Sequence, residues 1–577
     1  MNVQTLTTDI LILGAGGAGL FAALHAKKAN PELDVTIAVK GLLGKCGCTR
    51  MVQGGYNVAL SPGDSIERHF MDTIEGGGWL NDQDLAWLLV EIAPRRIREL
   101  ETELGCFFDR NPDGTVHQKA FAGQTFDRTV HKGDLTGIEI INRLAEQVWR
   151  RDVRRIEDHR ALDLIPTADG RELAGVLMLD MRTGEPLLVR ARATLLATGG
   201  GPTMYRYHTP SGDKSCDGLA MALRAGLALR DIEMVQFHPT GLLAGEGTRM
   251  TGTVLEEGLR GSGGYLTDAK GERFMFDYDA RGERATRDIV SRSIMDRIRK
   301  GFASPHGGVY IEMGHLGPER VRREFKGMVE RCEDCGFDLA AGRVEVIPTA
   351  HYMMGGVEFK ADCTTELSRL YAAGEDTGGV HGANRLGGNG VANSTVFGGV
   401  AGDVMGARTK RTGALPKPDK HAIDAANDRA FSPLGRKPGN LPEMRERMFN
   451  IMWSDVGILR TAESLARGKA ALDTLARDIA DCGVSDASRR YNLTWMDRLN
   501  LENLTLVSRA ICAAADFRRD SRGAHFREDF PQTSELDSSR YTSVRLADDR
   551  PVVSTEPVSF TRVRPGQTLL GRALAAG

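Results

Sequence analysis

Alternating apolar and polar stretches predict a chain of short strands and helices, and the N-terminal part shows the pattern most clearly. Residues 9–13 are an apolar run that ends directly at a group of glycines. Residues 20–28 then carry apolar side chains at helical spacing, and residues 35–39 form a second apolar run. The order of strand, glycine turn, helix and strand predicts a βαβ unit.

The glycine turn has the spacing Gly14-x-Gly16-x-x-Gly19. In a motif that begins where a strand ends, the first glycine allows the turn, the second lets backbone approach a pyrophosphate, and the third lets helix pack on strand. The motif therefore predicts dinucleotide binding. Lys40 stands where an acidic residue for the adenosine ribose is usual, and a lysine there could instead indicate the 2′-phosphate of NADP.

Two later segments favour FAD. Residues 193–201 form an apolar strand that ends in Ala-Thr-Gly-Gly, and residues 370–375 form a short strand that ends on Glu375. Both patterns are typical of two-domain flavoproteins, in which the chain returns to the nucleotide-binding sheet.

We therefore predict an α/β fold with a discontinuous Rossmann-like FAD-binding domain, an inserted α+β cap domain and a C-terminal helical domain. Long helical spacing at 283–300 lies in the predicted cap, and a Pro- and Lys-rich segment precedes the predicted helices of the C-terminal part. The predicted boundaries are 1–240 and 350–410 for the FAD-binding domain, 241–349 for the cap, 411–530 for the helical domain, and 531–577 for an irregular tail.

Composition narrows the possible functions. The 577 residues include 75 basic and 77 acidic side chains, so the net charge of −2 gives no electrostatic footprint for nucleic acid. Nine cysteines, an odd and scattered set, suit reduced thiols and predict a cytoplasmic location. No apolar run is long enough to span a membrane, so we expect membrane association only through partner subunits.

Four short segments combine histidine, arginine and glycine. They are residues 236–241, 286–288, 348–356 and 381–389. Two histidines and two arginines beside a flavin are what clamping a carboxylate requires. Cys332 and Cys335 lack a second pair at metal-ligand spacing, so no metal site is predicted.

With these segments, further motifs match one family in order. The motifs are Gln53-Gly-Gly55, Asp217-Gly218, residues 257–265 and residues 521–531. Over residues 8–531 the chain resembles the flavoprotein subunit of the succinate dehydrogenase and fumarate reductase family, which also contains L-aspartate oxidase. The resemblance implies hydride transfer at flavin N5 to or from a carboxylate-activated carbon-carbon bond. It also implies an iron-sulfur partner, because the cysteines of this chain lack ferredoxin spacing.

The resemblance also implies roles for individual residues. Arg287 would be the proton donor; His238, His351 and Arg385 would hold carboxylates; and Glu257 would lie in the substrate pocket. The alternative for Arg287 is a pair with Asp288 or Glu283 on the cap surface. The implied FAD-binding residues are Gly14, Gly16, Gly19, Lys40, Thr49, Gln53, Gly54, Gly55, Asp217, Glu375, Asn389, Gly390 and Val391.

Departures from the family pattern concern attachment and substrate. Cys48 stands where the respiratory enzymes carry the histidine that bonds covalently to FAD, so we expect non-covalent FAD, with a cysteinyl bond as the alternative. Glu256 and Met353 replace common threonines, and both are expected near one substrate carboxylate. An L-aspartate oxidase-like activity, a substrate other than a C4 dicarboxylate, and a non-catalytic FAD-binding protein therefore remain alternatives.

Overall fold

The N-terminal βαβ unit folds as the sequence predicts. The computed structural model describes residues 3–245, 248 and 250–571. Strand β1 (Gln4–Leu13) leads through the glycine turn into helix α1 (Gly17–Ala29), and β2 (Val35–Ala38) pairs in parallel with β1. Gly14 has a φ of +109°, a conformation that favours glycine. A Cβ atom on Gly19 would lie 2.0 Å from the carbonyl oxygen of Gly14, so the third glycine permits close contact between helix and strand.

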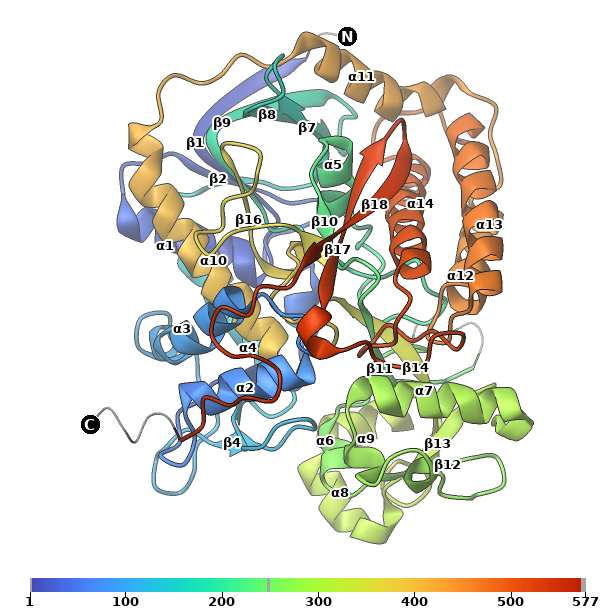
Figure 1. Cartoon of the computed structure of the whole chain (residues 1–577). Helices are drawn as coiled ribbons and strands as arrows, with labels where there is room; N and C mark the ends of the chain where they lie inside the picture. Colours follow the sequence, from blue (N-terminus) through green and yellow to red (C-terminus); the bar gives the residue numbers. More distant parts are fainter. Residues whose placement is uncertain (1–2, 246–247, 249, 572–577) are drawn as a thin grey trace.

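The central sheet has seven strands, in the order β6-β2-β1-β9-β8-β7, with β16 also paired to β9. Its other strands are β6 (Arg154–Ile156), β7 (His159–Pro166), β8 (Leu173–Asp180), β9 (Pro186–Leu196) and β16 (Leu370–Ala372). The pairings among β6, β2, β1, β9 and β16 are parallel, whereas β7-β8 and β8-β9 are antiparallel. Because β16 returns to this sheet after the inserted cap, the Rossmann-like domain is discontinuous (Figure 1).

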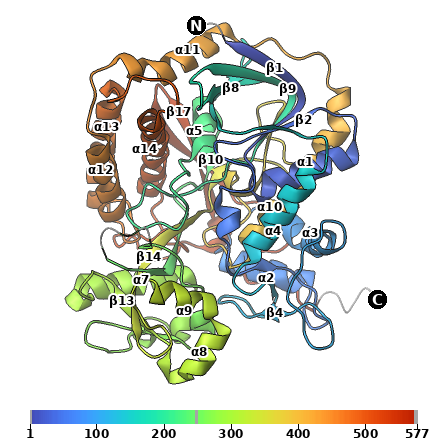
Figure 2. The ribbon, with the colours of Figure 1, turned by 180° about the vertical axis from the view of Figure 1, so that it is seen from behind.

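Helix α10 (Asn389–Arg408) packs along α1, as both ribbon views show (Figures 1 and 2). A Cβ on Gly398 would lie 2.5 Å from the carbonyl oxygen of Ala18, so the two helix backbones touch closely. The other helices of this domain are α2 (Ile66–Gly76), α3 (Gln83–Thr102), α4 (Thr136–Trp149) and α5 (Asp217–Arg224). Its short strands are β3 (Tyr56–Asn57), β4 (Gln118–Lys119), β5 (Thr129–Val130), β10 (Leu229–Arg230) and β15 (Gly356–Val357).

The cap is the green part at the bottom of Figure 1 and has its own apolar core, which includes Phe274, Val309 and Val346. Its antiparallel sheet has the order β11-β14-β13-β12. The strands are β11 (Val235–Leu242), β12 (Tyr265–Thr267), β13 (Val309–Glu312) and β14 (Arg343–Met353). The helices are α6 (Gly258–Gly261), α7 (Arg287–Arg297), α8 (Pro318–Glu324) and α9 (Lys326–Glu333).

The C-terminal part is helical, as predicted, and stands beside the Rossmann-like domain (Figure 1, orange). Its helices are α11 (Lys420–Phe431), α12 (Leu441–Ser454), α13 (Ala462–Asp481) and α14 (Leu493–Phe517). The expectation of an irregular tail is wrong for residues 540–557. There β17 (Arg540–Ala547) and β18 (Arg550–Pro557) form a hairpin, and β17 pairs with β10 of the Rossmann-like domain.

Candidate active site

A cavity of about 610 Å³ lies where the Rossmann-like domain meets the cap. Its wall includes Gly14 and Gly16 at the start of α1, Gly390 at the start of α10, and the cap residues Glu257 and Arg287. Cavities of about 300–1,000 Å³ are typical of small-molecule and cofactor sites. One continuous cavity thus joins the dinucleotide motif to the predicted substrate residues.

The end of the cavity at α1 is suited to an anion. Helix α1 has no acidic side chain in its first turn, and the backbone N–H of Gly17 donates to Thr49 Oγ1 at 3.0 Å. A Cβ on Gly16 would contact only that hydroxyl oxygen, at 3.6 Å, so space remains beside the turn. Unpaired N–H groups and the helix dipole together favour a pyrophosphate at such a position.

Lys40 has a buried anionic partner. Its Nζ lies 2.9 Å from Asp217 Oδ2 and also donates to Ser215 Oγ at 2.9 Å, while Arg160 Nη2 lies 2.7 Å from Asp217 Oδ1. Burial acts to raise the pKa of Asp217, but Arg160 and Lys40 hold it well below its ordinary value. Because the Lys40 ammonium is neutralised by a carboxylate, the structure gives no support to the NADP alternative.

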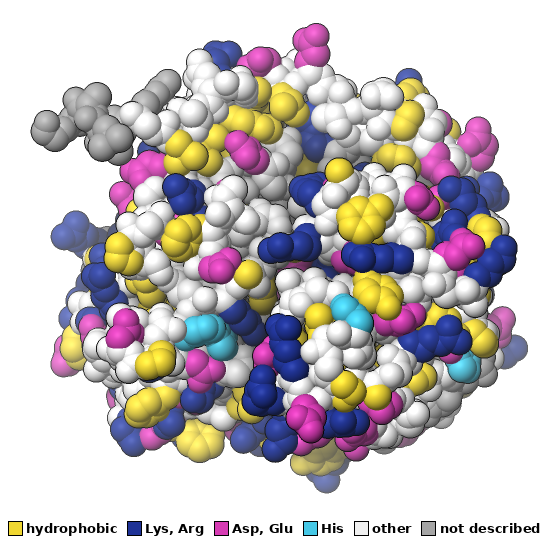
Figure 3. All heavy atoms as spheres, turned by 90° about the horizontal axis from the view of Figure 1, so that it is seen from below, with side chains coloured by type: hydrophobic (Ala, Val, Ile, Leu, Met, Phe, Trp, Pro, Cys, Tyr) yellow, Lys and Arg dark blue, Asp and Glu magenta, His cyan; other side chains and the backbone are white. Residues whose placement is uncertain are grey.

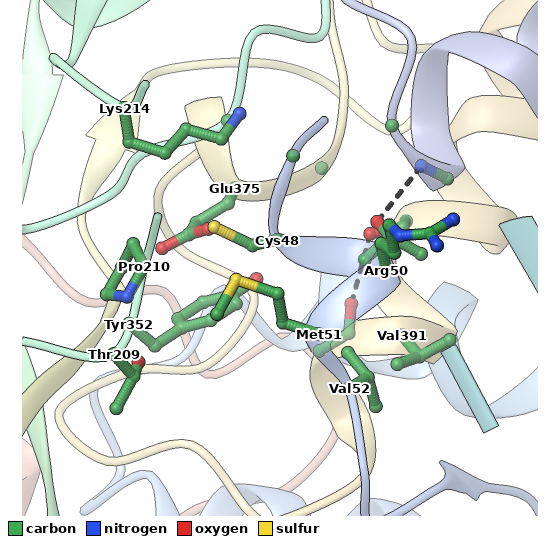
Figure 4. A pocket seen from close by; sticks show the side chains of 18 of the residues that line it. Cys48, Arg50, Met51, Val52, Thr209, Pro210, Lys214, Tyr352, Glu375 and Val391 are labelled. Atoms are coloured by element: carbon green, nitrogen blue, oxygen red, sulfur yellow. Dashed lines mark hydrogen bonds between the residues drawn. The ribbon is translucent and has the colours of Figure 1, made fainter. Parts of the chain in front are cut away.

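Cys48 lies on the wall of the cavity, at the start of the short 3₁₀ helix η1 (Cys48–Met51). Figure 4 shows its side chain directed toward Glu375, with Lys214 nearby. Burial raises the pKa of the Cys48 thiol to about 12 and that of Glu375 to about 7. The Cys48 side chain is therefore a neutral thiol at physiological pH, and a thiol is a poor nucleophile compared with a thiolate.

Arg287, at the start of α7, lies inside the cavity and not on the cap surface. Its side chain is only 7 % exposed, and its Nε and Nη2 lie 3.1 and 2.6 Å from Glu257 Oε2. Its Nη1 donates to Gln236 Oε1 at 3.0 Å. Burial acts to raise the pKa of Glu257, but Arg287 and then Arg260 lower it below its ordinary value. The alternative of a surface pair with Asp288 or Glu283 is therefore wrong.

Both predicted histidines and Arg385 face the same cavity. The rings of His238 and His351 lie 5.6 Å apart, and His351 Nδ1 is 2.8 Å from Thr209 Oγ1. Burial, then the Arg287 charge, hold the pKa of both histidines well below its usual range. The Arg385 guanidinium stacks 4.4 Å from the Tyr352 ring centre, and its Nε has no hydrogen-bond partner among the described residues. Neutral imidazoles and guanidinium groups with unused donors are suited to holding carboxylates.

The cavity wall brings together most of the predicted site residues. They are Gly14, Gly16, Lys40, Thr49, Gln53, Gly54, Gly55, Asp217, His238, Glu257, Arg287, His351, Glu375, Arg385, Gly390 and Val391. Three expected residues are placed differently. Gly19 packs against β1, Asn389 directs its side chain away to Asn57 and His69, and Met353 is fully buried against Gly200.

The position of Met353 contradicts the expectation that it and Glu256 lie together at one substrate carboxylate. Only Glu256 is on the cavity wall. The Met353 side chain fills the space above Gly200, while its backbone N–H donates to Glu375 Oε1 at 3.0 Å. The Met353 side chain, at the end of β14, therefore packs against Gly200 and does not line the cavity.

Two polar residues that support Arg287 were not among the predicted site residues. Gln236 also donates through Nε2 to the carbonyl oxygen of Arg385 at 2.7 Å, so it links both arginines. Arg260 Nη2 lies 3.4 Å from Glu257 Oε1. Sequence spacing offers a signal for each, because Gln236 is two residues before His238 on a strand and Arg260 is three residues after Glu257 at a helix.

The Ser521-Arg-Gly-Ala-His525 motif supports the loop that carries Arg385. The Ala524 N–H donates to the carbonyl oxygen of Ala383 at 2.9 Å. Gly523 has a φ of +51°, and a Cβ on it would lie 2.4 Å from the same oxygen. The C-terminal domain thus contacts the loop that carries Arg385 through a turn that requires glycine.

Metal ligation, membrane spanning and surface charge are three further properties of the described residues that bear on function. Within residues 3–245, 248 and 250–571, no group of three or more His, Cys, Asp or Glu side chains is placed to hold a metal ion. No helix in this part of the chain has the length and hydropathy needed to cross a membrane. On the face seen from below, basic and acidic side chains are interspersed (Figure 3), so that face carries no field of one sign.

The glycine turn and the discontinuous sheet form a dinucleotide-binding domain, and the cap borders its cavity. This arrangement is typical of dinucleotide-binding oxidoreductases. A family model described as FAD binding domain matches residues 9–391, and one described as fumarate reductase flavoprotein C-term matches residues 445–569. The chain belongs to the family of fumarate reductase and succinate dehydrogenase flavoproteins, as its motifs predicted, and these are FAD-dependent oxidoreductases.

Individual relatives extend over nearly the whole chain. It is 40 % identical over 542 residues to one of the subunits of the fumarate reductase (CoM/CoB) of Methanothermobacter marburgensis, covering 92 % of this chain and 96 % of that one. It is 33 % identical over 597 residues to the fumarate reductase flavoprotein subunit of Escherichia coli, covering 99 % and 97 %. A variant of FrdA from E. coli quinol fumarate reductase superposes with a TM-score of 0.92 at 32 % identity, covering 98 % and 99 %.

Proposed function

We propose that this chain is a catalytic flavoprotein subunit that interconverts a carboxylate-activated C=C bond and its saturated form, with fumarate and succinate as the substrate pair. The observation that carries the proposal is the placement of Arg287, His238, His351 and Arg385 around one cavity that begins at the glycine turn. A non-catalytic FAD-binding protein would have no need of buried, mutually repelling cations at that place.

The residues present fit FAD. The N-termini of α1 and α10 both face the cavity and offer backbone N–H groups to negative charge. Lys40, Asp217, Thr49 and Glu375 supply polar contacts along the wall between them. Bound FAD supplies or accepts the hydride at its N5 atom, as the chemistry of the reaction requires.

We further propose that FAD is held without a covalent bond. Cys48 cannot form the histidyl bond, and burial raises its pKa to about 12, so the nucleophilic thiolate is scarce. Helix dipoles and backbone N–H donors along the cavity are the interactions that hold a dinucleotide without a covalent bond.

The protein's own residues hold the substrate and move a proton. Arg385, His238 and His351 bind and orient the carboxylates, because their donors face the cavity. The fixed charge of Arg287 stabilises the enolate-like transition state, and an Nη of Arg287 holds the proton that passes to the substrate carbon.

Two ion pairs and a hydrogen bond lead from Arg287 into the cap. Arg287 pairs with Glu257, whose other oxygen lies 3.4 Å from Arg260 Nη2. Arg260 Nη1 donates to the carbonyl oxygen of Glu283 at 2.7 Å, and the Glu283 carboxylate lies 2.6 Å from Arg273, which is 43 % exposed. Proton exchange can therefore run among Arg287, Glu257 and Arg260, while the contact with the Glu283 backbone only positions Arg260.

Electrons enter or leave through a separate iron-sulfur protein in this proposal. The support is the family relationship, in which relatives carry names such as flavoprotein subunit. All nine cysteines are free, and no metal-binding group occurs in the described ranges of the chain. A cytoplasmic position, with membrane contact only through partners, stays a prediction.

A viologen-linked screen tests the proposal. The holoprotein should oxidise reduced viologen with fumarate, but not with maleate, whose carboxylates are cis, or with crotonate, which has only one. Turnover with L-aspartate and oxygen, and none with fumarate, would instead establish the oxidase alternative.

A further inference from the structure

Glu256 places a second carboxylate on the wall of the cavity, next to that of Glu257. It lies next to Glu257, which Arg287 and Arg260 neutralise, but it makes no contact with either arginine. Its partner is Lys119, whose Nζ lies 3.2 Å from Glu256 Oε2. The side chains are 20 % exposed for Lys119 and 7 % for Glu256, so solvent screens this pair only partly.

The pair joins the two domains beside the cavity. Lys119 is the last residue of β4 in the Rossmann-like domain, and Glu256 lies two residues before α6 of the cap. Lys119 Nζ also lies 5.7 Å from the ring centre of Phe121, itself part of the cavity wall. The ammonium group is therefore held beside the cavity.

The effect of the Lys119–Glu256 pair depends on the other charged side chains around the cavity. Arg287 and Arg385 on the wall, and Arg260 beside Glu257, carry positive charges, and Glu257 pairs with two of these three arginines. Arg331, also on the wall, interacts electrostatically with Asp134 and, more weakly, with Glu256. An unpaired Glu256 would oppose these positive charges, whereas Glu256 paired with Lys119 leaves more of their charge available to a substrate.

We propose that Lys119 is a specificity-determining residue, because by neutralising Glu256 it keeps the charge of the site matched to a dicarboxylate dianion. The inference rests on the proposed function and adds a residue from outside the motifs that define the site. Loss of Lys119 leaves a buried carboxylate that repels the second substrate carboxylate.

The test compares Lys119→Met, the double variant Lys119→Met/Glu256→Gln, and the control Lys132→Met as holoproteins. Lys132 pairs with Asp109 at 3.1 Å in the neighbouring loop and is absent from the cavity wall. Each is titrated with malonate, a dianion, through the change in flavin absorbance. KM and kcat are then measured for fumarate and for monomethyl fumarate, a monoanion.

Lys119→Met should weaken malonate binding and raise the KM for fumarate by about tenfold, with a smaller rise for monomethyl fumarate and little change in kcat. The double variant should recover most of the loss, and Lys132→Met should resemble wild type. Equal rises for both substrates, an unchanged KM, or no recovery in the double variant would overturn the proposal. Wild type that binds malonate but does not reduce fumarate would instead overturn the proposed reaction, and the malonate titration alone would then decide the role of Lys119.

Discussion

Replacing Arg287 with lysine separates proton transfer from charge. The guanidinium of Arg287 contacts Glu257 through two nitrogens and Gln236 through the third, at 2.6–3.1 Å. One ammonium group cannot span both partners, although it keeps the positive charge. We expect kcat for fumarate reduction to fall by about 10²–10⁴-fold, the usual contribution of a positioned acid, which corresponds to about 3–5 kcal/mol of transition-state stabilisation.

The assay is viologen oxidation under anaerobic conditions, with FAD content measured on the same preparation. Arg292→Lys is the matched control, since Arg292 lies on the same helix, pairs with Asp288 at 3.4 Å and is absent from the cavity wall. The Arg287→Lys variant should retain FAD and bind malonate. A kcat equal to wild type in a fully flavin-loaded sample would remove Arg287 from the mechanism and make His238 or His351 the next candidate acid.

Three further predictions concern the cofactor, the substrate and pH. Acid precipitation should release yellow FAD into the supernatant, whereas flavin that stays on the denatured chain and is lost in Cys48→Ser would establish a cysteinyl bond. Arg385→Lys should act mainly on KM, costing about 2–5 kcal/mol of substrate binding, because the stacked guanidinium clamps a carboxylate in ground and transition states alike; a loss confined to kcat would contradict this. Stability should fall as pH drops below about 6.5, because burial holds the pKa of several histidines low, so the unfolded chain takes up protons that the native state does not, each contributing up to about 1.4 kcal/mol per pH unit. These histidines are His69, His238, His351, His381 and His525. Burial raises the pKa of four carboxyl groups, those of Glu75, Asp231, Glu375 and Asp376, which acts in the opposite direction but involves fewer groups than the five histidines. A thermal-unfolding midpoint that rises between pH 7 and pH 5.5 would refute the expectation.

The parts of the fold and site that the sequence predicted correctly depend on residues close together in the chain. The glycine turn and both strands beside it depend on residues close in sequence, and the steric limits at Gly14 and Gly19 explain why their spacing is informative. The motifs around His238, Arg287, His351 and Arg385 likewise located the cavity wall.

The β17-β18 hairpin and the Lys119–Glu256 ion pair were not predicted, because both depend on residues far apart in the sequence. The β17-β18 hairpin turns at Asp548 and Asp549, both with positive φ, and it pairs with β10, hundreds of residues earlier. Neither the unusual turn residues nor the distant partner has a local signature. Lys119 is 137 positions from Glu256, so only the folded chain reveals that ion pair. Met353 was wrongly expected at the substrate carboxylate. Its place in the family motif indicated the right strand, but the direction of its side chain depends on packing against Gly200.

A single-turnover experiment tests the proposed reaction itself. The holoprotein is reduced photochemically without oxygen, mixed with fumarate in a stopped-flow instrument, and analysed for products by NMR. We expect the absorbance of oxidised flavin to return as one succinate forms per flavin, with Arg287→Lys binding fumarate but failing in this step. Flavin that stays reduced in the presence of saturating fumarate, in wild-type protein that binds malonate, would contradict the assignment of this chain as a fumarate-succinate flavoprotein.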